Sequence, residues 1–140
     1  MTTAGTNILG TGVDIVETSR IRDSLEKFGE RFLNRCFWPG EVAYCNGMKF
    51  PALHFAARFA AKEAISKAFG TGIGHQLGWK DMEIRKRDSG EPYAVLHGKG
   101  EELAKARGVT AVFVSLSHSK DYAAAQAVIV GHAPSAGANQ

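Results

Sequence analysis

Small apolar residues recur at helical spacing through the middle of the chain, between Pro51 and Gly70. At 100° per residue they fall on one side of a helix. The members of this stripe are Leu53, Ala57, Ala60, Ala64 and Ala68. Proline suits the first turn of a helix and glycine the position just after the last turn. The pattern therefore predicts a central helix of about five turns, whose small stripe is buried and allows another backbone to come close.

The opposite side of this helix mixes aromatic and charged residues, which a surface helix does not do. Its members are Phe55, Arg58, Phe59, Lys62, Glu63, Ser66, Lys67 and Phe69. We therefore expect this side to be covered too, by other parts of the chain or by another subunit, so that the charged residues line a cleft. A plainer interpretation is two i,i+4 pairs, Glu63 with Lys67 and Arg58 with Lys62, worth about 0.2–0.5 kcal/mol each.

Alternating residues near the start predict a strand over 8–17 that carries an acid on its apolar face. The residues that share this face are Ile8, Gly10, Gly12, Asp14 and Val16. Glycine within a strand often marks the approach of a ligand or of another backbone. Asp14 is either functional, or it bonds nearby backbone or caps the next helix, for which Thr18 or Ser19 is already available.

The remaining pattern predicts an α+β fold. It indicates helices at 19–28, 30–36, 39–44 and 99–107, and strands at 79–87, 92–97, 111–118 and 122–130. Because most connections are short, the sheet is expected to be mainly antiparallel and packed on the long central helix. We expect one domain over 1–132, followed by a disordered tail at 133–140.

Composition narrows the class of protein. The chain has 140 residues, of which 44% are hydrophobic and 22% charged, with a net charge of +3. This mild positive charge favours an acidic or phosphorylated partner but not a nucleic-acid-binding tail. Cys36 and Cys45 lack metal-binding spacing, and neither a signal peptide nor an apolar run of about 20 residues is present. We therefore predict a cytoplasmic protein with reduced thiols and no membrane span.

Two further segments carry candidate chemistry. The turn GTGIG at 70–74 is expected to expose backbone N–H groups beside Lys67 and His75, which suits a phosphate. It is neither a dinucleotide fingerprint nor a P-loop, and a flexible connector is the alternative. The segment SLSHSKDY at 115–122 places His118 at a strand end among serines, either as a structural histidine or as part of an anion pocket.

Taken together, these residues predict a Mg²⁺-dependent enzyme that acts on a phosphorylated small molecule. Two separated carboxylates, Asp14 and Glu63, suit Mg²⁺, which keeps several waters and takes one or two protein oxygens plus phosphates. The cations of the central helix would neutralise the remaining phosphate charge.

Three motifs carry a resemblance to a known family. GTGVDIVE at 10–17, RFAAKEAISKAFGTGIG at 58–74 and SLSHSKDYAAAQAV at 115–128 closely resemble the holo-[acyl-carrier-protein] synthase family, the small trimeric 4′-phosphopantetheinyl transferases. The resemblance implies the fold of that family and a homotrimer with active sites between subunits. It also implies transfer of 4′-phosphopantetheine from coenzyme A to a serine of acyl carrier protein, releasing adenosine 3′,5′-bisphosphate, a step of fatty acid biosynthesis.

The same resemblance implies roles for individual residues. Asp14 and Glu63 would hold Mg²⁺ and, with His118, form the catalytic set. Coenzyme A would contact Arg58, Lys62, Ser66, Lys67, Gly70, Thr71, Gly72, Ile73, Gly74, Ser117 and His118. Arg20, Lys27 and Arg31 would meet the acidic carrier. The proton of the attacking serine would go to Glu63 or to a water held by the metal, and the sequence leaves both open.

Two other classes of function compete with this interpretation. A non-catalytic module that binds coenzyme A or a carrier would keep the cations and the glycine turn but has no need of Asp14 and Glu63, and both are present. A nucleic-acid binder predicts aromatic residues interleaved with Lys and Arg on a sheet. The best candidate strand, 79–87, has only one aromatic residue.

Overall fold

This computed structural model describes residues 5–132. Along the chain, a long strand comes first, helices and two short strands follow, and two more long strands come last. The elements are β1 (Asn7–Glu17), α1 (Thr18–Phe28), α2 (Glu30–Cys36), α3 (Pro39–Asn46), α4 (Pro51–Ala68), the short helix η1 (Trp79–Asp81), β2 (Met82–Lys86), β3 (Pro92–Leu96), α5 (Gly98–Arg107), β4 (Val109–His118) and β5 (Tyr122–Gly131). The α+β class is confirmed, and the tail expected at 133–140 lies outside the described residues.

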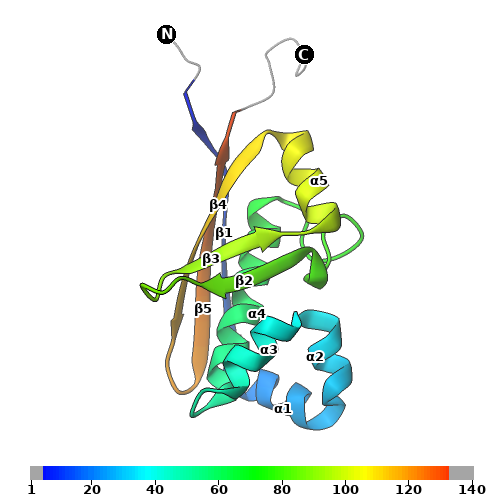
Figure 1. Cartoon of the computed structure of the whole chain (residues 1–140), viewed down its shortest axis with the longest axis vertical. Coiled ribbons are helices and arrows are strands. Elements are labelled where there is room, and N and C mark those ends of the chain that lie inside the picture. Colours follow the sequence, from blue (N-terminus) through cyan, green and yellow to red (C-terminus); the bar gives the residue numbers. More distant parts are fainter. Residues whose placement is uncertain (1–4, 133–140) are drawn as a thin grey trace.

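The long strands form a three-stranded antiparallel sheet in the order β1-β5-β4. They run side by side along the length of the molecule, with α4 packed against one face (Figure 1). The small stripe predicted for α4 is buried except for the half-buried Leu53, and Ala60 and Ala64 are fully inaccessible. A Cβ added to Gly10 or Gly12 would lie 2.0 Å from a carbonyl oxygen of α4. The glycines of β1 therefore allow the helix backbone to lie directly on the strand.

Register places the candidate residues of the two edge strands. Asp14 on β1 and Leu116 on β4 both pair with Ala125 of the central strand β5. Residues directly opposite each other share a face of a sheet, so Asp14 points to the α4 side, as predicted. Ile8 does not, because the register shifts between Ile8 and Gly10, and its side chain is 69% exposed.

A second antiparallel sheet, β2-β3, packs beside this layer. The strand expected to start at Trp79 begins at Met82 instead, because residues 79–81 form a 3₁₀ turn in which Asp81 Oδ2 accepts the Gly78 N–H at 2.7 Å. The expected cap of α1 by Thr18 or Ser19 is also wrong. The cap position is Glu17, which makes no side-chain cap bond.

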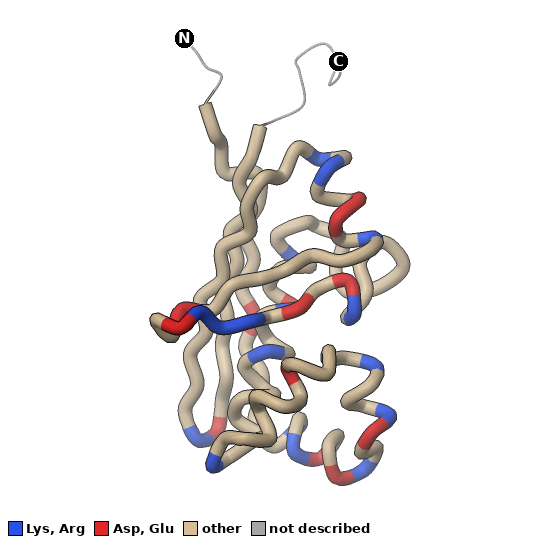
Figure 2. Tube along the Cα trace, viewed as in Figure 1, with Lys and Arg blue, Asp and Glu red and all other residues tan. Residues whose placement is uncertain are grey.

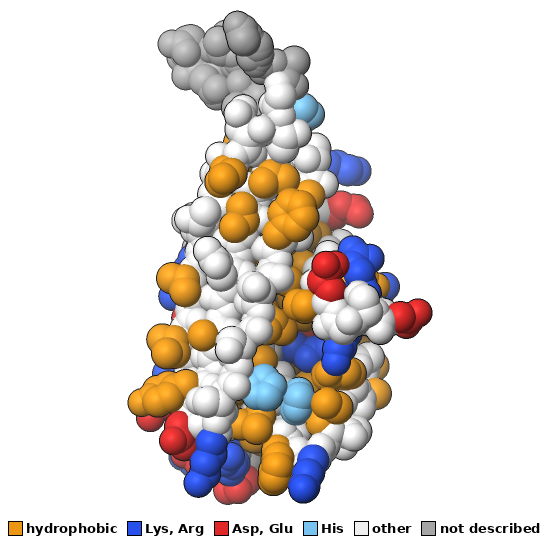
Figure 3. Space-filling view, turned by 90° about the vertical axis from the view of Figure 1, so that its left-hand side faces the viewer, with side chains coloured by type: hydrophobic (Ala, Val, Ile, Leu, Met, Phe, Trp, Pro, Cys, Tyr) orange, Lys and Arg blue, Asp and Glu red, His pale blue; other side chains and the backbone are white. Residues whose placement is uncertain are grey.

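The sheet face opposite α4 is bare and apolar. Val13 and Ile15 on β1 are each 66% exposed, and Phe113 on β4 is 60% exposed. Neither β4 nor β5 carries a Lys, Arg, Asp or Glu, and both strands are uncharged throughout in Figure 2. Hydrophobic side chains are spread along this sheet in Figure 3. Within residues 5–132, no helix is long and apolar enough to cross a membrane.

Candidate functional site

The first part of the site is a pair of carboxylates between β1 and α4, Asp14 and Glu63. Lys67, one turn after Glu63 on α4, donates to Asp14 Oδ1 at 2.9 Å and to the Val13 carbonyl at 3.1 Å. The Asp14 side chain is 13% exposed, whereas that of Lys67 is 50% exposed. The structure thus brings together three of the predicted residues, and it leaves the Lys67 ammonium within reach of a ligand.

Electrostatics makes this carboxylate pair a fit for a cation. Burial, and then the nearby charge of Asp14, raise the pKa of Glu63, while Lys67 and Arg20 act in the opposite direction. Two neighbouring carboxylates resist joint ionisation unless a positive charge lies between them. Among residues 5–132, no group of three or more His, Cys, Asp or Glu gathers in one place. Asp14 and Glu63 therefore match Mg²⁺, which needs few protein oxygens when waters and phosphates supply the rest.

The second part is a pocket of about 210 Å³ at the β4 edge of the sheet, which we call the histidine pocket. Its lining residues are Tyr44, Met48, His54, Ala57, Arg58, Lys86, Gly90, Pro92, Leu116 and His118. Two adjoining histidine side chains are visible in the hollow beside the sheet in Figure 3. His118 ends β4 on the α4 side, as predicted. None of the lining residues is acidic.

Arg58 is the buried cation of the histidine pocket. It is 5% exposed, and its guanidinium carbon lies 4.1 Å from the centroid of the Tyr44 ring. Its Nε is buried and has no hydrogen-bond partner among the described residues. A charge in such surroundings is stabilised by an opposite charge, and the pocket lining supplies none. Arg58 thus points to an anionic ligand.

Lys62 has a different role from the one expected. Its Nζ donates to Glu41 Oε1 at 2.8 Å, to the Cys36 carbonyl at 2.6 Å and to the Trp79 carbonyl at 3.3 Å. Neither side chain of the Lys62–Glu41 pair is exposed. The three donor positions of an ammonium are therefore all used inside the protein, which corrects the predicted contact with coenzyme A.

The glycine turn after α4 is ordered by its own hydrogen bonds. Thr71 N–H and Gly72 N–H both donate to the Ser66 carbonyl at 3.1 Å, and Gly70 N–H donates to the backbone carbonyl of Lys67 at 2.9 Å. Gly70 and Gly72 have φ of 79° and 66°, in the left-handed region that glycine adopts freely. Gly74 N–H donates to the Leu77 carbonyl, so the N–H groups of all three glycines and of Thr71 are engaged within the protein, and the prediction that they are free for a phosphate is wrong. The turn instead ends the helix just beyond Lys67.

Two predicted serines lie apart from the ligand pockets. Ser66 is fully buried and donates to the Glu63 carbonyl at 2.7 Å, so its hydroxyl serves the helix. Ser117 is exposed and alternates with His118 along β4, which places it on the opposite face of the sheet. Within one chain, neither serine contributes to the histidine pocket.

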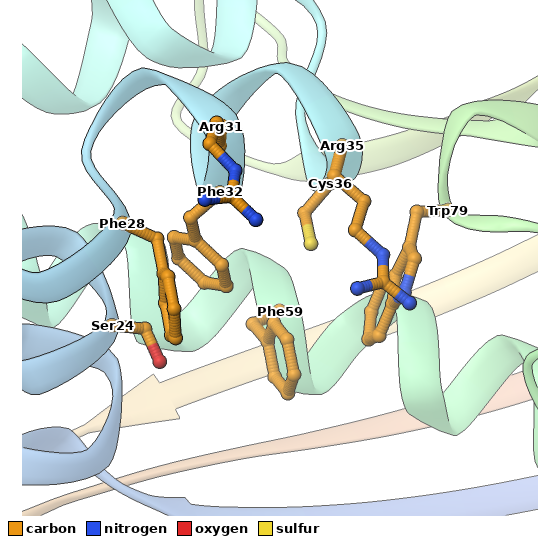
Figure 4. Close-up of a pocket in the computed structure, with 8 residues that line it drawn as sticks. All are labelled: Ser24, Phe28, Arg31, Phe32, Arg35, Cys36, Phe59 and Trp79. Carbon is orange, nitrogen blue, oxygen red and sulfur yellow. The ribbon is translucent and has the colours of Figure 1, made fainter.

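The third part is an apolar groove of about 380 Å³ between α1, α2 and α4, which we call the aromatic groove. It is lined by Ser24, Phe28, Arg31, Phe32, Arg35, Cys36, Phe59 and Trp79. In Figure 4 the aromatic rings line its inner wall, with the guanidinium groups of Arg31 and Arg35 beside them. Phe59 stacks on Trp79 with ring centroids 4.5 Å apart. Arg20 and Lys27, the other cations expected to meet a carrier, are exposed on α1.

The carboxylate pair and the histidine pocket lie on opposite flanks of α4. Arg58 and Glu63 are five residues apart, which places them about 140° apart around the helix. Asp14 belongs to the β1 edge of the sheet and His118 to the β4 edge, and the central strand lies between these edges. In one chain, α4 therefore separates the two parts.

Sequence reasoning missed three polar side chains of the histidine pocket, those of Tyr44, His54 and Lys86. Helical spacing indicates His54, because it lies one turn before Arg58 on α4 and so shares its face. Tyr44 and Lys86 come from α3 and β2, and no spacing in the sequence links either to α4.

The antiparallel sheet covered by one long helix carries a carboxylate pair and a separate cationic pocket, groups that suit a phosphorylated ligand. Residues 10–127 match the family model described as "4'-phosphopantetheinyl transferase superfamily". The chain belongs to this superfamily, and its relatives place it in the holo-[acyl-carrier-protein] synthase family.

Three relatives illustrate the likeness. The holo-[acyl-carrier-protein] synthase of Koribacter versatilis is 44% identical over 87% of this chain and 98% of its own. That of Chlamydia trachomatis serovar L2 is 48% identical over 86% of this chain and 98% of its own. The crystal structure of the Helicobacter pylori synthase in complex with coenzyme A has a TM-score of 0.77 and 32% identity, covering 85% of this chain and 98% of that one.

Proposed function

We propose that this protein transfers 4′-phosphopantetheine from coenzyme A to a serine of apo-acyl carrier protein, giving holo-acyl carrier protein and adenosine 3′,5′-bisphosphate. The observation that carries the proposal is the pair Asp14 and Glu63, held beside Lys67 in a fold of this family. A module that only bound coenzyme A or a carrier would have no use for two adjacent carboxylates that resist joint ionisation. Their presence favours the enzyme.

The reaction exchanges one phosphorus–oxygen bond for another. The serine oxygen attacks the phosphorus that carries pantetheine, the bond from that phosphorus to the bridging oxygen breaks, and adenosine 3′,5′-bisphosphate leaves with the electron pair. Such a transfer needs positioning and charge neutralisation more than covalent help. Asp14 and Glu63 would hold Mg²⁺, which when bound neutralises pyrophosphate charge.

Lys67 and Glu63 have separate parts in this scheme. The half-exposed Lys67 ammonium stays fixed beside Asp14 and contributes positive charge to the phosphates. Burial and the charge of Asp14 raise the pKa of Glu63, so Glu63 is one candidate acceptor of the serine proton, and a water held by the metal is the other.

The carrier would dock on α1 and the aromatic groove. Arg20, Lys27 and Arg31 supply positive charge on this side, and Arg20 is close enough to Glu63 to act on its pKa. Phe59 in the groove precedes Glu63 by one helical turn, so the groove leads toward the carboxylates. An acidic carrier with an apolar contact surface, bound here, would present its serine to the reacting phosphorus.

The complete site would form between copies of the chain in a homotrimer. The bare face of the sheet, with Val13, Ile15 and Phe113 exposed, offers a surface that association would cover. In one chain α4 separates the histidine pocket from the carboxylate pair. Coenzyme A bound at the carboxylates of one subunit would then also contact Arg58 and His118 of the next subunit, which complete its binding site. The two buried free thiols, Cys36 and Cys45, are compatible with the cytoplasm as the site of reaction.

Mass spectrometry tests this function directly. The protein is incubated with apo-acyl carrier protein, coenzyme A and Mg²⁺, with and without EDTA, and the intact mass of the carrier is measured. A gain of one phosphopantetheine that EDTA abolishes is the expected result. No gain on several carriers, with coenzyme A still bound by calorimetry, would support the non-catalytic module instead.

A further inference from the structure

We propose that His54 is a phosphate-binding residue, which makes the affinity of the histidine pocket for a phosphate monoester dianion depend on pH. The inference rests on the proposed function, because the 3′-phosphate of coenzyme A is the monoester in question. Neither the sequence motifs nor the chemistry of transfer involves His54.

The geometry places His54 at the centre of the pocket's polar groups. Its ring lies 4.9 Å from that of His118, centroid to centroid, at 68° between planes, and 6.0 Å from that of Tyr44. Arg58 follows one turn later on the same helix and lines the same cavity. The two imidazoles come from α4 and β4 and lie in contact, so a ligand that met both would be held by both elements that form this edge of the fold.

The charges that face His54 are all positive or neutral. They are Arg58 on its own helix, Lys86 on β2, His118 on β4 and the Tyr44 phenol on α3. Lys86 Nζ donates to the Tyr44 hydroxyl at 3.1 Å, and Arg58 Nε has no hydrogen-bond partner within residues 5–132. Arg58, Lys86, His118 and His54 itself are or can become cationic, and they line about 210 Å³ with no carboxylate in the lining. Such a pocket fits an anion with several acceptor oxygens.

The empty pocket already disfavours a protonated His54. Burial, followed by the neighbouring His118, Arg58 and Lys86, lowers the pKa of His54 below its ordinary value. His54 is therefore neutral near pH 7 in the free protein. A bound phosphate dianion reverses the balance of charge and raises the pKa of His54, so that binding takes up a proton. Affinity then falls as pH rises through the range in which the bound imidazole loses this proton.

Calorimetry with two donors isolates the effect. Dissociation constants of coenzyme A and of 3′-dephospho-coenzyme A are measured at about pH 6 and about pH 8, which bracket histidine titration. The proteins compared are the full chain, His54→Phe, His54→Asn and the control His132→Phe, a substitution of an exposed histidine that follows β5. Because the 3′-phosphate itself titrates equally in every protein, the comparison between proteins reports on His54.

Binding of coenzyme A is expected to weaken by roughly tenfold in both His54 variants at the lower pH, the ratio given by one charge-assisted contact of ordinary strength. At the higher pH the loss should be small. The His54 variants should bind dephospho-coenzyme A as tightly as the full chain does. The His132→Phe variant should bind both donors as tightly as the full chain at both pH values. Proton uptake, measured in buffers of different ionisation enthalpy, should decrease in the His54 variants.

Two results would overturn the assignment of His54. One is coenzyme A binding that is equal in the full chain and in both His54 variants. The other is an equal loss of coenzyme A affinity at both pH values, which would mean that His54 contacts the ligand without gaining a proton. If the full chain bound neither donor, the proposed function itself would fail, and that outcome is distinct from both.

Discussion

Lys62 and Glu41 form a salt bridge of 2.8 Å between Nζ and Oε1, with both side chains fully buried. Glu41 also accepts the backbone N–H groups of Trp38 and Ile84, at 2.8 and 2.9 Å. The pair thus connects α4, α3 and β2 on the side of α4 that faces away from the three-stranded sheet. Lys62 lies next to Glu63 in the sequence, yet its contacts are with the protein's own core.

Replacement of Lys62 by Met should therefore destabilise the fold, by about 3–5 kcal/mol, because it leaves the Glu41 carboxylate buried without its partner. Lys67→Met, five residues later, is the matched control. It removes a half-exposed ammonium and should lower the unfolding midpoint much less than Lys62→Met does while decreasing transfer. Urea unfolding and the carrier mass assay measure the two effects. A stable, inactive Lys62→Met would return Lys62 to the ligand-binding set.

Gly12→Ala should separate β1 from α4. A Cβ at this position would lie 2.0 Å from the Ala64 carbonyl oxygen. Overpacking of this kind costs about 1–3 kcal/mol or more, and any outward shift of β1 also moves Asp14 away from Glu63. We expect lower stability and lower transfer together. Gly47→Ala is the control, since its nearest contact would be 3.4 Å and its φ is −79°. Equal unfolding midpoints for the two variants would contradict the close packing of β1 on α4.

Glu63→Gln should abolish transfer without destabilising the protein. Because burial and Asp14 raise the pKa of Glu63, its ionisation opposes folding, and the free energy of unfolding decreases as pH rises through its titration. At neutral pH the variant should unfold at the same or a higher temperature than the parent. Added Mg²⁺ should raise the unfolding temperature of the parent only.

Glu83→Gln is the opposite case and serves as the comparison. Burial alone would raise the pKa of Glu83, but hydrogen bonds from Arg85 and His97 outweigh it and hold that pKa below the ordinary value. Ionised Glu83 therefore stabilises the fold above the unfolded-state pKa, and this stability is lost as pH falls through the folded-state value. Glu83→Gln should lower the unfolding temperature at neutral pH. If both variants shifted stability in the same direction, the assigned signs would be wrong.

The sequence predicted the central elements of this site well, because they depend on local rules. Pro51 and Gly70 gave the ends of α4, and alternation along β1 placed Asp14 on the helix side. Tertiary pairing accounts for the failures. The partner of Lys62 lies 21 residues away on another helix, and a bulge moved Ile8 to the outer face. The periodicity within a single helix or strand predicts neither the partner of Lys62 nor the register shift at Ile8.

Backbone hydrogen bonding explains the remaining error. The glycines of the 70–74 turn indicated free N–H donors, but composition does not say which acceptors are near. The Ser66 carbonyl accepts two of these donors, since carbonyls in the last turn of a helix lack intrahelical partners. The pairing of β1 with β5 was equally hidden, because these strands lie at opposite ends of the chain.

Phe113→Ser should shift the protein from trimer to monomer. Phe113 is 60% exposed on the bare sheet face, where we place the contact between copies. Phe50→Ser is a matched control, since Phe50 is also 60% exposed but precedes α4, outside the sheet. Light scattering after size exclusion measures the mass of each. A parent protein that is already monomeric, or a trimeric and active Phe113→Ser, would argue against this surface as the interface.

The most direct test of the central claim mixes two inactive variants. Asp14→Asn lacks one carboxylate and Arg58→Met lacks the buried cation, so each alone should leave the mass of apo-acyl carrier protein unchanged. In trimers assembled from both, a ring of identical contacts places an intact carboxylate pair against an intact histidine pocket at about one quarter of the sites. Transfer should then return to about a quarter of the parent rate. A mixture as inactive as its parts would contradict a site built from two copies, and an unmodified carrier with the parent protein would contradict the function itself.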